Sequence, residues 1–220
     1  MKRIMIVTDS IGLPRDGVPY EDTILNKFES WGSLWVMGGG GETVSSDYSR
    51  VANMTYYLRQ NFFDAGIIMI GLVDCAPRPL PMTVRYIVST LPEWFQEPVV
   101  KIIHFLRPVL VRIGLYQFTP IYPFKRTYEL LLDACQKLCK RVVVIGICPV
   151  KADVDEHSPG LTKQIEVYNV VIEGLVKEHG FSFIDISDFP ETYLTDDAHL
   201  NSEGHKRLGL LIDKTLPGVK

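Results

Sequence analysis

The chain has 220 residues, of which 46% are hydrophobic and 22% are charged, and its formal net charge is -3. These values are those of an ordinary globular protein, and the lack of a basic excess argues against a nucleic-acid partner. A chain of this length fits one large domain, and no linker-like segment divides it. We therefore expect residues 1–220 to form a single domain.

The amino-terminal residues do not resemble a signal peptide, because the apolar run at residues 4–7 is too short and leads directly into Asp9. Cys135 and Cys139 are four residues apart on a predicted helix, a spacing that could suit a metal, but no second pair accompanies them. Separate buried thiols in a reducing compartment fit all four cysteines better. We therefore expect a cytoplasmic protein without a metal or another cofactor.

Short apolar runs predict five β-strands, at residues 3–7, 34–37, 66–71, 142–147 and 182–186. Segments with helical character or helical spacing of apolar residues lie between and after them, at residues 20–30, 46–60, 122–140, 162–178 and 202–216. This alternation predicts an α/β fold, a three-layer α/β/α sandwich with a mostly parallel five-stranded sheet. In such a sheet the ligand site lies beyond the carboxyl ends of the strands.

A strongly apolar segment at about residues 79–121 interrupts the alternation. Within it, residues 99–113 carry polar side chains only in a narrow helical stripe, and Pro108 should break or kink a helix there. Three basic side chains and the short length argue against a transmembrane span. We interpret the segment as a buried helical insertion. The alternative is a lid or subunit contact that presents apolar surface beside the ligand site.

Polar or glycine-rich clusters follow the predicted strands. They are Thr8-Asp9-Ser10, Gly38 to Gly41, Gly71-Leu-Val-Asp74 and Asp196-Asp-Ala-His199. Taken alone, each has a structural explanation, because Thr, Asp and Ser are good helix caps and glycines suit flexible turns. Their shared position at strand ends is the physical argument for a common site.

Taken together and in order, these clusters resemble the SGNH hydrolases, the GDSL-type esterase and lipase family, over nearly the whole chain. Thr8-Asp9-Ser10 resembles the family's GDS block, with Thr in place of Gly, and Gly41 resembles the glycine of its second block. Gly71-Leu-Val-Asp74 resembles the GxND block, and Asp196-Asp-Ala-His199 resembles the DxxH block. The resemblance implies a flavodoxin-like fold and a metal-independent serine ester hydrolase.

The resemblance also implies the roles of the residues. Ser10 would be the nucleophile, and His199 would be the general base that takes its proton. Asp196 would fix the imidazole's tautomer, with Asp197 as the competitor for that role. The backbone N–H groups of Ser10 and Gly41 would donate hydrogen bonds to the oxyanion.

The chain departs from the family at Val73, where the GxND block has an asparagine that donates to the oxyanion. Loss of one such donor costs about 3–4 kcal/mol of transition-state stabilisation. Either two backbone donors suffice, or another side chain substitutes, or catalysis is weak. Arg78 is the candidate substitute, and it could equally hold a substrate carboxylate or phosphate or form a surface ion pair. Asp9 and Asp74 are expected to support the site structurally.

The substrate that the resemblance implies is a small acyl ester, such as an O-acetyl group on a carbohydrate. The run Asp74-Cys-Ala-Pro-Arg78 resembles family members associated with bacterial surface polysaccharide synthesis. A lipid or thioester substrate stays open. Two alternatives use the same fold, namely an O-acyltransferase acting on a sugar and a non-catalytic carbohydrate-binding relative. A homo-oligomer is compatible with the sequence.

Overall fold

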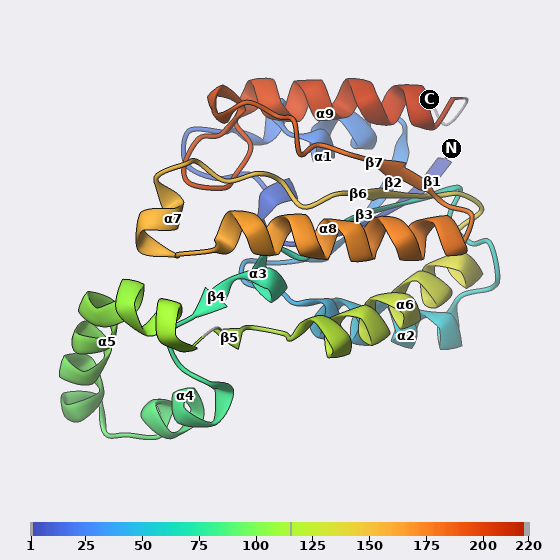
Figure 1. The fold of residues 1–220 in the computed structure, drawn as a ribbon. Helices are drawn as coiled ribbons and strands as arrows, with labels where there is room; N and C mark the ends of the chain where they lie inside the picture. The colour runs from blue at the N-terminus through green and yellow to red at the C-terminus, as the bar shows by residue number, and fades with distance from the viewer. Residues whose placement is uncertain (1, 115, 218–220) are drawn as a thin grey trace.

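The computed structural model describes residues 2–114 and 116–217, and a sheet between two layers of helices forms its centre (Figure 1). The strands are β1 (Lys2–Thr8), β2 (Gly32–Gly38), β3 (Ala65–Met69), β6 (Val142–Ile145) and β7 (Ser182–Ile184). Their order is β2-β1-β3-β6-β7, and every neighbouring pair is parallel. The predicted sandwich and its five strands are confirmed, with the strand order of flavodoxin-like folds.

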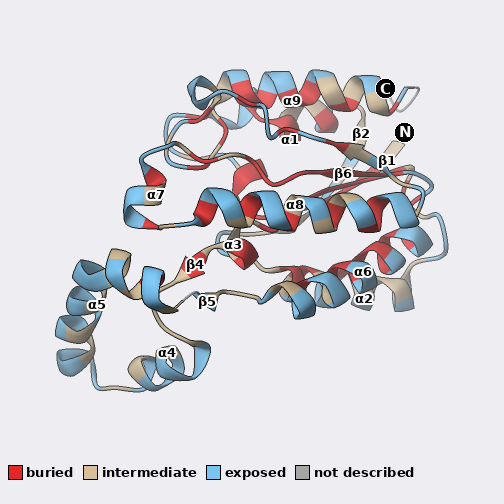
Figure 2. Cartoon of the chain, viewed as in Figure 1, coloured by how far each residue is buried: buried red, intermediate tan, exposed pale blue. Residues whose placement is uncertain are grey.

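Helices cover both faces of this sheet. One layer contains α2 (Val44–Tyr57), α6 (Ile121–Leu138) and α8 (Leu161–Glu178), and the other contains α1 (Ile24–Glu29) and α9 (Ser202–Thr215). Side chains of β1 alternate between the two cores, since Met5 and Val7 join the first and Ile4 and Ile6 join the second. Buried residues therefore concentrate between the sheet and its helices (Figure 2).

Short elements complete the sandwich. They are the helices α3 (Leu72–Cys75) and α7 (Val154–His157) and the 3-10 turns η1 (Ser10–Gly12), η2 (Tyr20–Asp22) and η3 (Glu191–Tyr193). No helix in the described part of the chain is long and apolar enough to cross a membrane.

The insertion between β3 and α6 projects from the sandwich as two helices, α4 (Met82–Ser89) and α5 (Glu93–Gly114) (Figure 1). Its base is closed by an antiparallel pair of two-residue strands, β4 (Pro77–Arg78) and β5 (Tyr116–Gln117).

The interpretation of this insertion as buried is wrong. Of the residues in α4 and α5, all of which the structure describes, only Val111 is buried. Large apolar side chains face solvent, among them Trp94 at 78% exposure and Phe105 at 85%. The helix α5 also continues through Pro108 instead of ending there, and it bends along its length (Figure 1).

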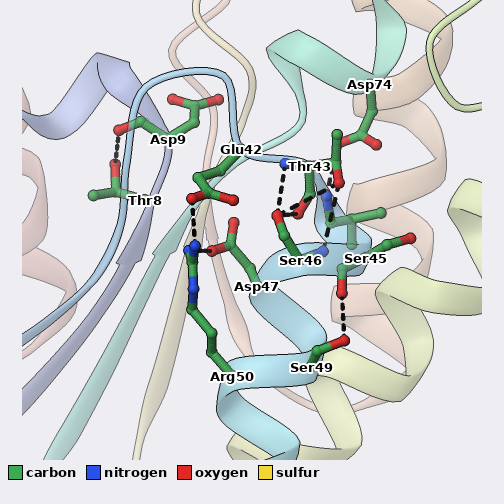
Figure 3. A network of polar contacts seen from close by, with 11 residues as sticks. Thr8, Asp9, Glu42, Thr43, Ser45, Ser46, Asp47, Ser49, Arg50 and Asp74 are labelled. Carbon is green, nitrogen blue, oxygen red and sulfur yellow. Dashed lines mark hydrogen bonds and ion pairs between the residues drawn. The ribbon is translucent and has the colours of Figure 1, made fainter. Parts of the chain in front are cut away.

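Three buried carboxyl groups lie close to the carboxyl edge of the sheet (Figure 3). Asp9 follows β1, Asp47 lies in the first turn of α2 and Asp74 lies in α3, and each is at most 1% exposed. Burial raises the pKa of Asp9 to about 7, and the charge of Asp74 adds to this shift. Burial also raises the pKa of Asp47 to about 7; the charge of Glu42 contributes, and Arg50 opposes it.

The buried carboxyl of Asp47 makes stability depend on pH. Its folded-state pKa of about 7 lies above its ordinary value of 3.8, so the folded protein binds this proton more tightly than the unfolded chain. The free energy of unfolding therefore falls as the pH rises between these two values, by about 1.4 kcal/mol per pH unit for one such group.

Asp47→Asn should remove this dependence while keeping the shape of the side chain. Urea unfolding at several pH values between 5 and 7 should show the variant gaining stability relative to the parent as the pH rises, by about 1.4 kcal/mol per unit. Asp188→Asn, at an exposed position, is the control and should run parallel to the parent. Parallel curves for Asp47→Asn would contradict the assignment.

Candidate active site

Ser10 lies directly beyond the carboxyl end of β1, the strand between β2 and β3. The preceding residue, Asp9, caps the turn η1, because its Oδ1 accepts the N–H of Ile11 at 3.0 Å. Of the residues that could cap a helix here, Asp9 is therefore the one that caps this turn, and Ser10 is the first residue of the turn. Ser10 Oγ lies 2.9 Å from His199 Nε2, across 189 positions of the chain.

His199 lies in a loop whose ends are tied together before α9. Leu194 and Leu200 form an isolated antiparallel bridge, and the N–H of Thr195 donates to the carbonyl of His199 at 2.8 Å. Asn201 then caps α9 by accepting the N–H of Gly204. The imidazole therefore projects from a short loop with few conformations, which is the condition for a well-defined contact with Ser10.

Asp196 is the carboxylate that meets His199. Its Oδ1 lies 2.8 Å from His199 Nδ1 and also accepts the N–H groups of Ala198 and His199, at 3.1 and 2.9 Å. Partial burial opposes ionisation, but the N–H of Ala198 and the contacts with His199 lower the pKa of Asp196 below its usual value. The neighbouring Asp197 is exposed, and among the residues that the structure describes only its backbone carbonyl makes a hydrogen bond, to the N–H of Lys151.

This arrangement favours one tautomer of His199. An ionised Asp196 accepts a hydrogen bond from Nδ1–H, which keeps the proton on Nδ1, so the lone pair of Nε2 faces Ser10 Oγ. Chemically, the three groups are a serine, an imidazole base and an orienting carboxylate, and the serine and the carboxylate each lie in hydrogen-bond reach of one nitrogen of the imidazole.

Arg15, a residue that no sequence motif places at this site, also contacts this carboxylate. Its Nη1 lies 2.7 Å from Asp196 Oδ2, on the side away from the closest contact with the imidazole. Both side chains are partly exposed, so the ion pair contributes little to stability, about 0–1 kcal/mol. Arg15 belongs to an irregular loop after η1, and no motif or spacing links it to Asp196.

The loop after β2 lies beside Ser10, because Gly38 and Thr8 are paired at the ends of β2 and β1. Gly41 in this loop has a φ of 78°, in the region that favours glycine. In residues 2–114 and 116–217, neither the N–H of Ser10 nor that of Gly41 has a protein acceptor. Both are therefore available to an acceptor on a bound molecule.

Asp74 acts as a connector under this loop. Its Oδ2 accepts the N–H of Val44 at 2.9 Å, and its Oδ1 accepts the hydroxyl of Thr119. It thereby ties α3 to the first residue of α2 and to the segment that leads into α6. Val73, beside it in α3, offers no side-chain donor.

Arg78 lies in β4 at the base of the insertion, with its guanidinium carbon 4.9 Å from the centre of the Phe118 ring. Within the described part of the chain it makes no hydrogen bond to Ser10, Gly41 or His199. The structure thus brings Ser10, Asp196 and His199 together, whereas Arg78 lies against the ring of Phe118 at the base of the insertion.

Neither a protein-family model nor a curated protein matches the sequence. Solved structures match over nearly their whole length. The lipase/acylhydrolase from Enterococcus faecalis is 16% identical, with a TM-score of 0.63 over 97% of this chain and 94% of that chain.

Two further structures agree. A member of the lipolytic protein G-D-S-L family from Veillonella parvula is 14% identical, with a TM-score of 0.61 over 98% of this chain and 97% of that chain. A carbohydrate acetylesterase family member from Sinorhizobium meliloti is 15% identical, with a TM-score of 0.63 over 98% and 99%. The resemblance suggested by the sequence motifs is therefore confirmed at the level of architecture, and the chain has the fold of the GDSL-type, or SGNH, hydrolases.

Proposed function

We propose that the chain is a serine ester hydrolase in which Ser10 is the nucleophile, His199 the general base and Asp196 the orienting carboxylate. The single observation that carries this proposal is the 2.9 Å contact between Ser10 Oγ and His199 Nε2. A serine hydroxyl is a weak nucleophile at neutral pH unless a base takes its proton, and this contact supplies the base.

In the proposed mechanism Ser10 Oγ attacks the ester carbonyl carbon while its proton passes to His199 Nε2. Asp196 accepts a hydrogen bond from Nδ1–H and stabilises the imidazolium that forms. The carbonyl oxygen becomes an oxyanion and accepts hydrogen bonds from the N–H groups of Ser10 and Gly41. The tetrahedral intermediate then expels the alcohol, which takes the proton from His199. Water, activated by the same imidazole, releases the acid from Ser10.

The proposed substrate is a small acyl ester, such as an O-acetyl group on a carbohydrate. The carbohydrate acetylesterase from Sinorhizobium meliloti supports this class, as does an acetylxylan esterase from Geobacillus stearothermophilus with a TM-score of 0.58. We also propose a cytoplasmic location. All four cysteines are free and buried, which supports a reducing compartment.

The two adjacent aspartates allow a matched test of the orienting carboxylate. Asp196→Asn keeps the side-chain shape but removes the acceptor for Nδ1–H, so kcat/KM for p-nitrophenyl acetate should fall by about 10²–10⁴-fold. Asp197→Asn makes the same chemical change one position away, at an exposed side chain, and should stay within about threefold of the parent. Equal losses in the two variants would contradict the assignment of Asp196.

Position 73 tests the account of the oxyanion. If only two backbone N–H groups serve it, Val73→Asn should supply a third donor and raise kcat by about tenfold or more. Val73→Leu is the control, because leucine branches at the same carbon as asparagine but has no hydrogen-bond donor. It should not raise kcat. An equal gain in kcat for the leucine and asparagine variants, or an unchanged kcat in both, would contradict an oxyanion site with only two donors.

A further inference from the structure

The insertion lines an open pocket of about 280 Å³ at its base. Three arginines from three different elements line it, namely Arg78 from β4, Arg85 from α4 and Arg107 from α5. The chain as a whole carries a net charge of -3, so a general basic excess does not explain this gathering of positive charge.

The three guanidinium groups are held in place. Arg78 and Arg85 both lie over the ring of Phe118, with guanidinium carbons 4.9 and 4.7 Å from its centre. Arg107 donates to the hydroxyl of Ser158 at 2.9 Å and to the carbonyl of His157 at 3.2 Å. Side chains fixed in this way lose little conformational entropy when a ligand binds.

Their positive charge has no counter-ion among the described side chains. Within the described part of the chain, none of the three forms an ion pair with a carboxylate. The Nε–H of Arg78 is buried and has no acceptor among the residues that the structure describes. Burial, together with the charges of Arg85 and Arg107, lowers the pKa of Arg78 below its ordinary value. Clustered guanidiniums with unused donors are the usual receptor for a planar or tetrahedral oxyanion.

We infer that this pocket binds a phosphate group through Arg78, Arg85 and Arg107. A phosphate carries up to two negative charges and several terminal oxygens, which match three forked cations better than a single carboxylate does. The same pocket is also lined by Leu80, Val100 and Ile103, so it has apolar surface for an organic group attached to the phosphate.

The pocket is connected to the candidate active site through the backbone. The N–H of Phe118 donates to the carbonyl of Ala76, and the N–H of Thr119 donates to the carbonyl of Asp74. The aromatic ring under Arg78 and Arg85 is thus fixed to the segment that carries Asp74. As a second step we take the phosphate to be part of the ester substrate; this step rests on the proposed hydrolase function, whereas the anion site does not.

Binding of inorganic phosphate tests the anion site without any hydrolysis. Isothermal titration calorimetry at constant ionic strength should give saturable binding to the parent. Arg85→Gln should raise the Kd about tenfold, because Arg85 makes no hydrogen bond to a described residue and its loss removes one charged donor group. Arg126→Gln changes the same residue type at an exposed position of α6 and should bind as the parent does.

No saturable binding to the parent at millimolar phosphate would overturn the site, as would equal affinities for Arg85→Gln and Arg126→Gln. Arg85→Lys separates charge from geometry if the glutamine variant folds poorly. It keeps the charge but loses the planar fork, and its affinity should lie between those of the parent and Arg85→Gln.

Rates of ester hydrolysis show whether the bound phosphate is part of the substrate or is free phosphate. The parent should prefer an O-acetylated sugar phosphate over the same acetylated sugar without phosphate, and Arg85→Gln should lower this ratio of kcat/KM values about tenfold. Equal ratios in both proteins, with phosphate binding intact, would overturn the substrate step and identify free phosphate as the occupant. Phosphate binding without turnover of either ester would overturn the hydrolase proposal and leave the anion site standing.

Discussion

The contact between Ser10 and His199 depends on closure of the whole sandwich, because it joins the end of the first strand to the loop before the last helix. That closure has its own contacts on the α1–α9 face. Lys27 pairs with Asp213 at 2.9 Å, and Ser202 donates to Asp22 at 2.7 Å. The proposed chemistry is therefore a property of the complete fold, since no local segment contains both the nucleophile and its base.

Much of this arrangement could be predicted from the sequence, because the residues concerned obey local rules. Fully apolar runs such as Val142–Ile145 form buried parallel strands, and the residues that follow strands gather at one edge of the sheet. The spacing between Asp196 and His199 places both on one short loop. These features can be predicted from the spacing of apolar residues along the chain and from the chemical character of the residues between the strands.

The remaining features depend on contacts between distant segments, which periodicity does not encode. An apolar helix such as α5 looks the same in sequence whether its surface is covered or faces solvent. The ion pair of Arg15 with Asp196 joins two irregular loops, and the gathering of Arg78, Arg85 and Arg107 depends on how the insertion folds back on its base. Such pairings become visible only when the backbone path is known.

The proposed function depends above all on one property of the molecule, that the hydroxyl of Ser10 is an activated nucleophile. A fluorophosphonate reacts with such a serine by releasing fluoride and forming a bond between phosphorus and Oγ. Mass spectrometry of the digested protein should locate this adduct on the peptide that contains Ser10, and His199→Ala should abolish it. A folded parent protein whose Ser10 stays unlabelled would contradict the claim, as would labelling that persists without His199.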